Sequence, residues 1–270
     1  MKKSMRAALG LIAVCCCLGG LSLPSAYGAN QADKKEIVRQ ARQAYYNLRS
    51  SGLVQFQAKL QPNWRVLLKD QDPAKAAESV KVLEGLHFSM SLDDKGAVKV
   101  LHRVDASVAD DKRFTDAFGQ IIGGMEQMTT GFFDTWSPFM LTSAFPAVES
   151  EYQLEDKGDV YLLSYKDGND SVETTLSKLL VILEIKVTDP TFRSSIKPQF
   201  KTSSHGFVLT GYESTYVGTT NADNVQLSVS IDNQEVSQMQ LPRQLNLSGT
   251  SQGTPFAVEL AISEYQVNNH

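Results

Sequence analysis

The second half of the chain alternates short apolar segments with turn sequences and shows no helical periodicity from about Glu149 onward. Turn signals rich in Gly, Asn, Asp and Pro stand at 155–159, 166–170, 187–191, 203–206, 218–224, 232–235 and 249–255. Between them lie the strand-like segments 161–165, 179–187, 207–216, 225–231, 236–247 and 256–267. Connections this short predict antiparallel hairpins, because parallel neighbours need crossovers of roughly a dozen or more residues.

Two of these segments, 225–231 and 256–262, alternate strictly between apolar and polar residues. Strict alternation is typical of a strand with one buried face and one wet face. The apolar positions then shift by one residue before Tyr265. This shift predicts a β-bulge or bend near Ser263 and Glu264.

The first half of the chain adds helices and a further hairpin. Residues 37–48 carry apolar side chains at helical spacing, whereas 54–68 alternate with a period of two and predict one long strand. Residues 73–86 predict a short helix with Asp72 as its N-cap, and 88–104 predict a hairpin.

About ten antiparallel strands cannot remain flat and open without curling. The sequence therefore predicts an α+β fold: a large curved antiparallel sheet, or half-barrel, of about ten strands with helices covering its concave face. No linker, low-complexity run or repeat divides residues 29–270, which predicts a single domain.

Residues 114–140 hold the most apolar and aromatic stretch outside the N-terminus, and their apolar positions recur every three or four residues. Gly123, Gly124 and Gly131 each weaken such a helix by roughly 1 kcal/mol relative to Ala and are expected to divide it, and Pro138 is expected to end it. The apolar stripe either fills the core or lines a deformable cavity for an apolar ligand. The candidate ligand-binding residues are Phe118, Ile122, Met125, Met128, Phe132, Phe133, Trp136, Phe139 and Met140.

Residues 1–28 have the features of a secretory signal peptide: a positive start, an apolar run over 7–23 and small residues before a cleavage point at Gly28 and Ala29. The chain is therefore expected to be exported to the periplasm or secreted. Removal of Lys2, Lys3 and Arg6 changes the formal net charge from −4 to about −7. Without a basic patch, nucleic acid and anionic membrane surfaces are poor candidate partners.

The only cysteines, Cys15, Cys16 and Cys17, lie inside this predicted signal peptide. Cleavage would leave a mature chain without cysteine, so its core alone would hold the fold. Lipidation of one of them stays open, although the small residue that usually precedes a lipidated cysteine is missing.

The sequence patterns typical of catalytic and metal-binding sites lack the structural context that such sites require. The sequence "GTSQG" at 249–253 matches a nucleophile elbow, but a strand follows it where a helix is required. The four histidines show no ligand spacing, and the phosphate-binding glycine loops are absent. Paired acidic residues stand in or beside turns, where solvated carboxylates are expected. We therefore expect no enzyme activity, no catalytic residue, no metal and no cofactor.

The closing stretch "MQLPRQLNLSGTSQGTPFAVELAISEYQVN" (239–268) resembles the ending of the LolA/LolB-like outer-membrane lipoprotein-sorting family, and "GFVLTGYEST" (206–215) resembles a preceding strand of the same plan. The resemblance implies a half-open antiparallel barrel whose helices cover an apolar cavity for acyl chains. The helix at 73–86 and its hairpin depart from that plan. No residue of this chain corresponds to the polar residues that regulate cavity opening in the family.

Two function hypotheses follow. The first is a periplasmic binder or carrier of a lipid, an acylated protein or another apolar group, with an apolar cavity of several hundred Å³ beneath the helix at 112–137. The second is a non-enzymatic interaction or scaffold protein of the cell envelope, with a filled core and an exposed apolar patch or bare sheet edge. The identity of the ligand or partner and the oligomeric state do not follow from the sequence.

Overall fold

The computed structural model describes residues 28–106, 115–218 and 224–269. The three cysteines lie outside the described residues, and Gly28 is the only residue of the predicted signal peptide within them. The helices are α1 (Gly28–Gln43), α2 (Trp64–Leu67), α3 (Pro73–Leu83) and α5 (Thr115–Met140). The strands are β1 (Leu53–Pro62), β2 (Leu86–Leu92), β3 (Val98–Val104), β4 (Tyr152–Asp156), β5 (Val160–Asp167), β6 (Asp170–Ser177), β7 (Ile182–Thr188), β8 (Phe192–Ser203), β9 (Gly206–Gly218), β10 (Val225–Val236), β11 (Met239–Ser251) and β12 (Thr254–Asn269).

All twelve strands form one antiparallel sheet in the order β3-β2-β1-β12-β11-β10-β9-β8-β7-β6-β5-β4. The strands from β4 to β12 follow one another as a meander, as the turn signals predict. Strand β1 pairs with β12, so the first hairpin extends the sheet beyond the last strand. Among the described strands the sheet does not close, and β3 and β4 form its two ends. The α+β prediction is confirmed, with twelve strands in place of about ten.

The predicted bulge is present in β12. Glu264 has a φ of 53°, and the pairing of β1 with β12 shifts register between Gln57 and Lys59. The extra residue moves Tyr265 back onto the buried side, where it packs against Phe56 with ring centroids 5.3 Å apart. The change in apolar parity therefore corresponds to a real irregularity of the strand.

Two predicted boundaries are wrong. Residues 64–67 form the single turn α2, and do not continue the strand β1 beyond Pro62. Helix α1 ends at Gln43, well before residue 48. It ends there because the chain pairs with β9: the Phe207 N–H donates to the Ala44 carbonyl at 2.8 Å. Gly206 permits this approach, since a Cβ there would lie 2.6 Å from the same carbonyl oxygen.

Helix α3 agrees with its predicted cap. The Asp72 carboxylate accepts hydrogen bonds from the N–H groups of Ala74 and Lys75, at 3.1 and 3.2 Å, and Pro73 begins the helix. These bonds satisfy donors that have no partner within the first turn of a helix.

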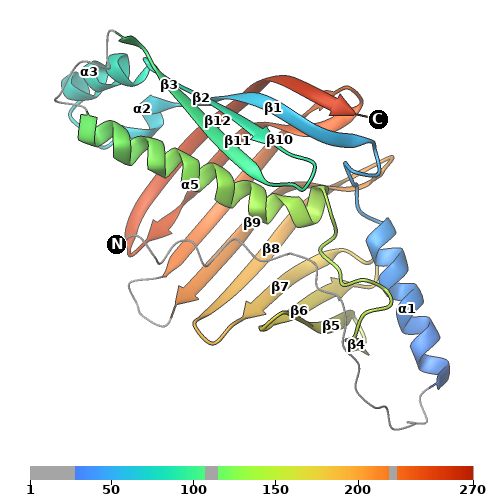
Figure 1. Cartoon of the computed structure of the whole chain (residues 1–270). Coiled ribbons are helices and arrows are strands. Elements are labelled where there is room, and N and C mark those ends of the chain that lie inside the picture. Colours follow the sequence, from blue (N-terminus) through green and yellow to red (C-terminus); the bar gives the residue numbers. More distant parts are fainter. Residues whose placement is uncertain (1–27, 107–114, 219–223, 270) are drawn as a thin grey trace.

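Helix α5 lies along the inner face of the curved sheet, between the β1–β3 end and strands β8 and β9 (Figure 1). Helix α1 lies beside the β4–β7 end of the sheet. Lys35 of α1 forms an ion pair with Glu149, and Arg42 donates to the carbonyls of Phe145 and Pro146 at 2.7 and 2.9 Å. The segment between α5 and β4 is therefore held by α1, and the buried apolar side chains of the chain form one connected cluster.

Candidate functional site

Helix α5 is continuous over its 26 residues, so Gly123, Gly124 and Gly131 do not divide it. Pro138 lies inside the helix, and the prediction that it ends the helix is wrong by two residues. The last turn persists because the Leu141 N–H donates to the Ser137 carbonyl at 2.8 Å. The carbonyl of Met140 then accepts from the Leu48 N–H at 2.8 Å.

The structure brings the nine candidate residues to the same side of this helix, facing the sheet or its margins. Seven are buried: Phe118, Met125, Phe132, Phe133, Trp136, Phe139 and Met140. Ile122 and Met128 are partly buried and pack against the same cluster. The apolar stripe read from the sequence is therefore the face that α5 presents to the sheet.

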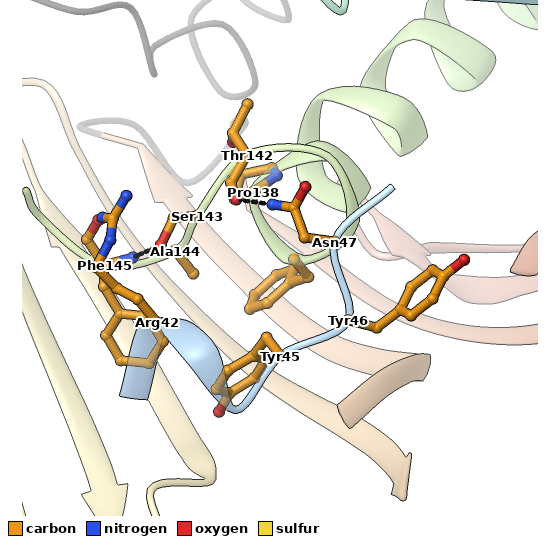
Figure 2. Close-up of a pocket in the computed structure, with 10 residues that line it drawn as sticks. Arg42, Tyr45, Tyr46, Asn47, Pro138, Thr142, Ser143, Ala144 and Phe145 are labelled. Carbon is orange, nitrogen blue, oxygen red and sulfur yellow. Dashed lines mark hydrogen bonds between the residues drawn. The ribbon is translucent and has the colours of Figure 1, made fainter. Parts of the chain in front are cut away.

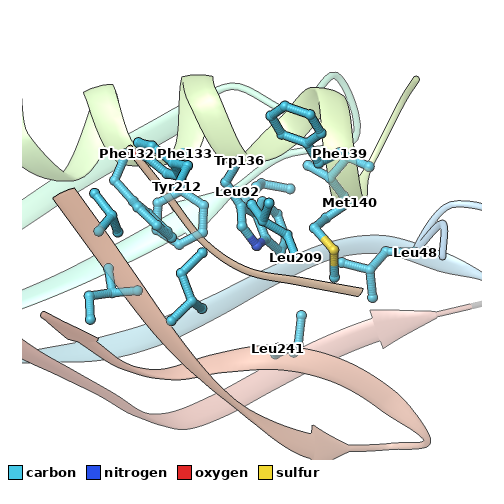
Figure 3. Packing of buried hydrophobic residues seen from close by; sticks show 14 of the residues in the cluster. Leu48, Leu92, Phe132, Phe133, Trp136, Phe139, Met140, Leu209, Tyr212 and Leu241 are labelled. Carbon is cyan, nitrogen blue, oxygen red and sulfur yellow. The ribbon is translucent and has the colours of Figure 1, made fainter. Parts of the chain in front are cut away.

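Aromatic rings occupy the interface between α5 and the sheet (Figure 3). Phe133 contacts Phe132 and Trp136 edge to face, with centroids 4.9 and 5.3 Å apart. Phe139 meets Phe200 of β8 at 5.8 Å in the same geometry. Edge-to-face pairs of this kind add stability beyond the area that they bury. The side chains of α5 themselves occupy the space between the helix and the sheet.

Two buried polar atoms on the sheet-facing side of α5 have no hydrogen-bond partner. They are the Nε1 atom of Trp136 and the Oγ1 atom of Thr129, and both residues are 0% exposed. Thr174 of β6 has an unpartnered hydroxyl oxygen as well. Nearly all buried polar groups of folded proteins are paired, so these positions are exceptions within an otherwise apolar interior.

The amide oxygen of Asn233 also has no partner, although its NH2 group donates to the Leu209 carbonyl at 2.9 Å. Other polar groups are satisfied. The Thr135 hydroxyl donates to the Gly131 carbonyl at 3.1 Å and lies within hydrogen-bond reach of the buried Tyr212 side chain. The Tyr265 hydroxyl donates to the Pro242 carbonyl at 2.6 Å. Burial raises the pKa of both tyrosines well above the usual range, so they remain neutral.

A polar hollow of about 500 Å³ opens at the C-terminal end of α5. A second space, of about 10 Å³, lies between that end and the segment that follows α1, and it shares several lining residues with the hollow (Figure 2). The larger hollow is lined by Arg42, Gln43, Tyr45, Tyr46, Asn47, Ser50, Ser51, Thr142, Ser143 and His205. The Asn47 amide donates to the Thr142 carbonyl at 2.6 Å, so this hollow is bridged by side chains that anchor the end of α5. It is not the apolar cavity expected beneath the helix.

Burial and ion pairing with lysines explain the pKa shifts of three described carboxylates. Burial raises the pKa of the Asp134 carboxyl, which is half-buried on α5 beside Phe133. Carboxylates elsewhere pair with lysines: the Lys35 ammonium group lowers the pKa of Glu149, and Lys178 lowers that of Asp156. Within the described ranges no group of three or more His, Cys, Asp or Glu side chains is arranged to hold a metal ion.

Sequence reasoning found the apolar stripe but missed Thr129 and the residues of the hollow. Thr129 falls at helical spacing with Met125 and Phe132, and a polar residue inside an apolar stripe is a signal that could have identified it. The hollow gathers residues from three segments that are distant in the sequence, 42–51, 142–143 and His205, so no local pattern marks it. None of the helices in the described part of the chain is long and apolar enough to cross a membrane. We found no family model, no curated protein and no solved structure that matches this chain.

Proposed function

We propose that this chain is an exported, non-enzymatic binder or carrier of a lipid, an acyl group or another apolar ligand, and that α5 is a movable cover over the binding site. The observation that carries the proposal is the position of α5. One long helix, whose buried side is formed by aromatic and methionine side chains, lies along the inner face of an open curved sheet.

The exposed side of α5 supports a role as a cover. Gly119, Gly123 and Gly124 are exposed, and a Cβ at any of them would meet no atom within 4 Å. No close contact therefore requires glycine at these positions. Together they reduce the intrinsic stability of the helix by roughly 3 kcal/mol relative to Ala. The helix depends on its packing against the sheet, and detachment from the sheet favours its unfolding.

The ligand would take the place of side chains that now fill the interface. Met125, Met128 and Met140 have flexible unbranched side chains that adapt to irregular apolar shapes. The resemblance of 239–268 to the lipoprotein-sorting family, and the signal-like N-terminus, agree with a carrier of acyl groups outside the cytoplasm. In this proposal the described structure is the closed, ligand-free state.

The test is uptake of a fluorescent fatty acid by the purified mature chain, together with native mass spectrometry of protein prepared from membranes. We expect saturable binding of the probe and co-purifying acyl mass. Protein that is free of such mass and does not take up the probe would refute the proposal.

One alternative is favoured by a separate observation: a scaffold protein that binds a partner at a sheet edge. Strand β3 pairs only with β2 among the described strands, and its Leu101 is 49% exposed. An unpaired edge is a template for a further strand. Pull-down from envelope extracts with wild-type protein and a Val100→Pro variant would separate the two functions. A partner that requires the edge, combined with no probe uptake, would favour the scaffold.

A further inference from the structure

The unpartnered atoms of Trp136 and Thr129 occupy related positions on α5. The two residues are seven positions apart, which places them on the same side of the helix and about 10 Å apart along its axis. Figure 3 shows the indole nitrogen of Trp136 on the side of α5 that faces the sheet. An indole N–H is a donor only, and a threonine hydroxyl can donate as well as accept. Both groups thus offer a hydrogen to the space between the helix and the sheet.

The interior around them contains no described cation that could hold an anionic ligand. The buried polar or charged residues of the described chain are Thr129, Thr135, Asp170 and Thr174. Moving an ionised carboxylate or phosphate into such surroundings is strongly unfavourable. A neutral acceptor attached to an apolar chain, by contrast, would satisfy the free donors without this penalty.

We propose that Trp136 and Thr129 determine the specificity of the site, each by donating a hydrogen bond to a separate neutral carbonyl group, as in an ester or an amide, on the apolar ligand. This inference rests on the proposed function, because it places the ligand beneath α5. It narrows the ligand class to acyl esters and amides, in preference to plain hydrocarbons and to acids that must bury their charge.

The experiment compares two pyrene-labelled chains of equal length, one a plain hydrocarbon and one that carries two ester groups about 10 Å apart, the rise between the two donors along the helix. We expect the wild-type protein to bind the ester at least about tenfold more tightly, as two neutral hydrogen bonds would give. Thr129→Val removes the hydroxyl group with little change of shape. It should reduce this preference, measured as the ratio of the two affinities within the same variant. Thr135→Val is the matched control, because Thr135 already has partners within the protein, and it should retain the wild-type preference.

Trp136→Phe also removes a donor but leaves space in the core, so a second measurement follows the indole group directly. The chain has two tryptophans, and Trp136→Phe assigns their indole signals in a nitrogen–proton NMR spectrum. We expect the Trp136 N–H proton to move downfield with the ester and not with the hydrocarbon. Equal affinity of the wild-type protein for the two probes, or equal indole shifts, would overturn the inference and leave the proposed function standing. Binding of neither probe would refute the proposed function itself.

Discussion

The hydroxyl group of Tyr45 accepts a hydrogen bond from the backbone N–H of Ile182 at 2.7 Å. The same hydroxyl donates to the carbonyl of Leu180 at 3.0 Å. One side chain, placed just after α1, thereby satisfies two backbone groups at the start of β7. Leu180 has a φ of 63°, an unfavourable backbone conformation for leucine that these bonds help to hold.

Tyr45→Phe should therefore lower the free energy of unfolding by about 1–3 kcal/mol, because it leaves a part-buried donor and acceptor without their partner. The ring contacts with Phe145, Phe200 and Phe207 would remain. Urea unfolding measures the change. Tyr152→Phe is the control: its hydroxyl donates only to the nearby Val148 carbonyl at 3.2 Å, and we expect a smaller loss. Equal losses for both variants would contradict this account.

The antiparallel meander could be predicted because turn sequences and alternation are local signals. The bulge before Tyr265 was predictable for the same reason. One inserted residue moves every later side chain of the strand to the opposite face, and the apolar pattern shows this shift. Strands β4, β6 and β8 were not predicted. In β6 the buried positions include Asp170 and Thr174, so its alternation of burial is not an alternation of hydrophobicity. Such strands form because both neighbours supply hydrogen bonds, which a single-sequence pattern does not reveal.

The ends of elements depended on distant contacts. Residues 44–48 continue the helical pattern of α1, yet the chain leaves the helix to pair Tyr45 with Phe207 of β9. The candidate site was likewise predictable only as far as local spacing reveals it. The spacing of apolar residues identified the buried side of α5, but whether Trp136 and Thr129 have partners depends on the strands opposite them. Only the assembled structure shows that they do not.

Removal of the unpartnered hydroxyl of Thr129 should stabilise the ligand-free protein. Thr129→Val replaces a buried polar group that lacks a hydrogen bond with an apolar group of the same shape, so we expect the free energy of unfolding to rise by roughly 1 kcal/mol. Thr135→Val should lower it by a similar amount, because the hydroxyl of Thr135 is bonded to the Gly131 carbonyl. Thermal unfolding of both variants without ligand tests this difference in sign. A loss of stability in both would imply that Thr129 has a partner.

A reversible tether between α5 and the β2–β3 turn should slow ligand uptake. A Cβ built on Gly96 would lie 3.7 Å from the Ser137 side-chain oxygen, a separation suited to a disulfide after small adjustments. In the predicted cysteine-free mature chain, the Gly96→Cys/Ser137→Cys pair would be the only thiols. We expect oxidised protein to take up the fluorescent probe at least about tenfold more slowly than reduced protein, because the cover cannot leave the hairpin.

The two single variants, Gly96→Cys and Ser137→Cys, control for the effect of each substitution. Gly96 has a φ of 84°, so its replacement is strained in its own right. Both single variants should take up the probe at rates that do not change on addition of a reductant. If the oxidised double variant matched its reduced form, α5 would not separate from this hairpin during uptake.

Asp134 gives the stability of the protein a specific dependence on pH. Burial raises the pKa of its carboxyl above the value in the unfolded chain. The folded state is therefore penalised at pH values above both pKa values. This penalty disappears as the pH falls through the folded pKa toward the unfolded one. Asp134→Asn should accordingly increase the free energy of unfolding at pH 7, and its advantage over wild type should shrink toward about pH 4.

Urea unfolding of wild type and Asp134→Asn across this pH range provides the measurement. Glu126→Gln, at an exposed position of the same helix, controls for the loss of one negative charge. An advantage of Asp134→Asn that stays constant with pH would mean that an effect independent of the charge of the carboxyl is responsible.

If α5 is the proposed cover, its exposed glycines distinguish a helix that unfolds on opening from one that moves as a rigid body. Gly123→Ala and Gly124→Ala have free space for the added methyl group and should each raise the free energy of unfolding by about 1 kcal/mol. Gly211→Ala is the contrasting control. Its Cβ would lie 2.4 Å from the Val229 carbonyl oxygen, so we expect a loss of stability there.

Probe uptake by the Gly123→Ala/Gly124→Ala double variant then tests how α5 opens. If opening requires this segment to unfold, the added helical stability is lost on the way to the open state. Uptake should then slow by roughly tenfold or more, since about 2 kcal/mol is added to the barrier. A stabilised protein with unchanged uptake would show instead that the helix stays intact as it lifts from the sheet.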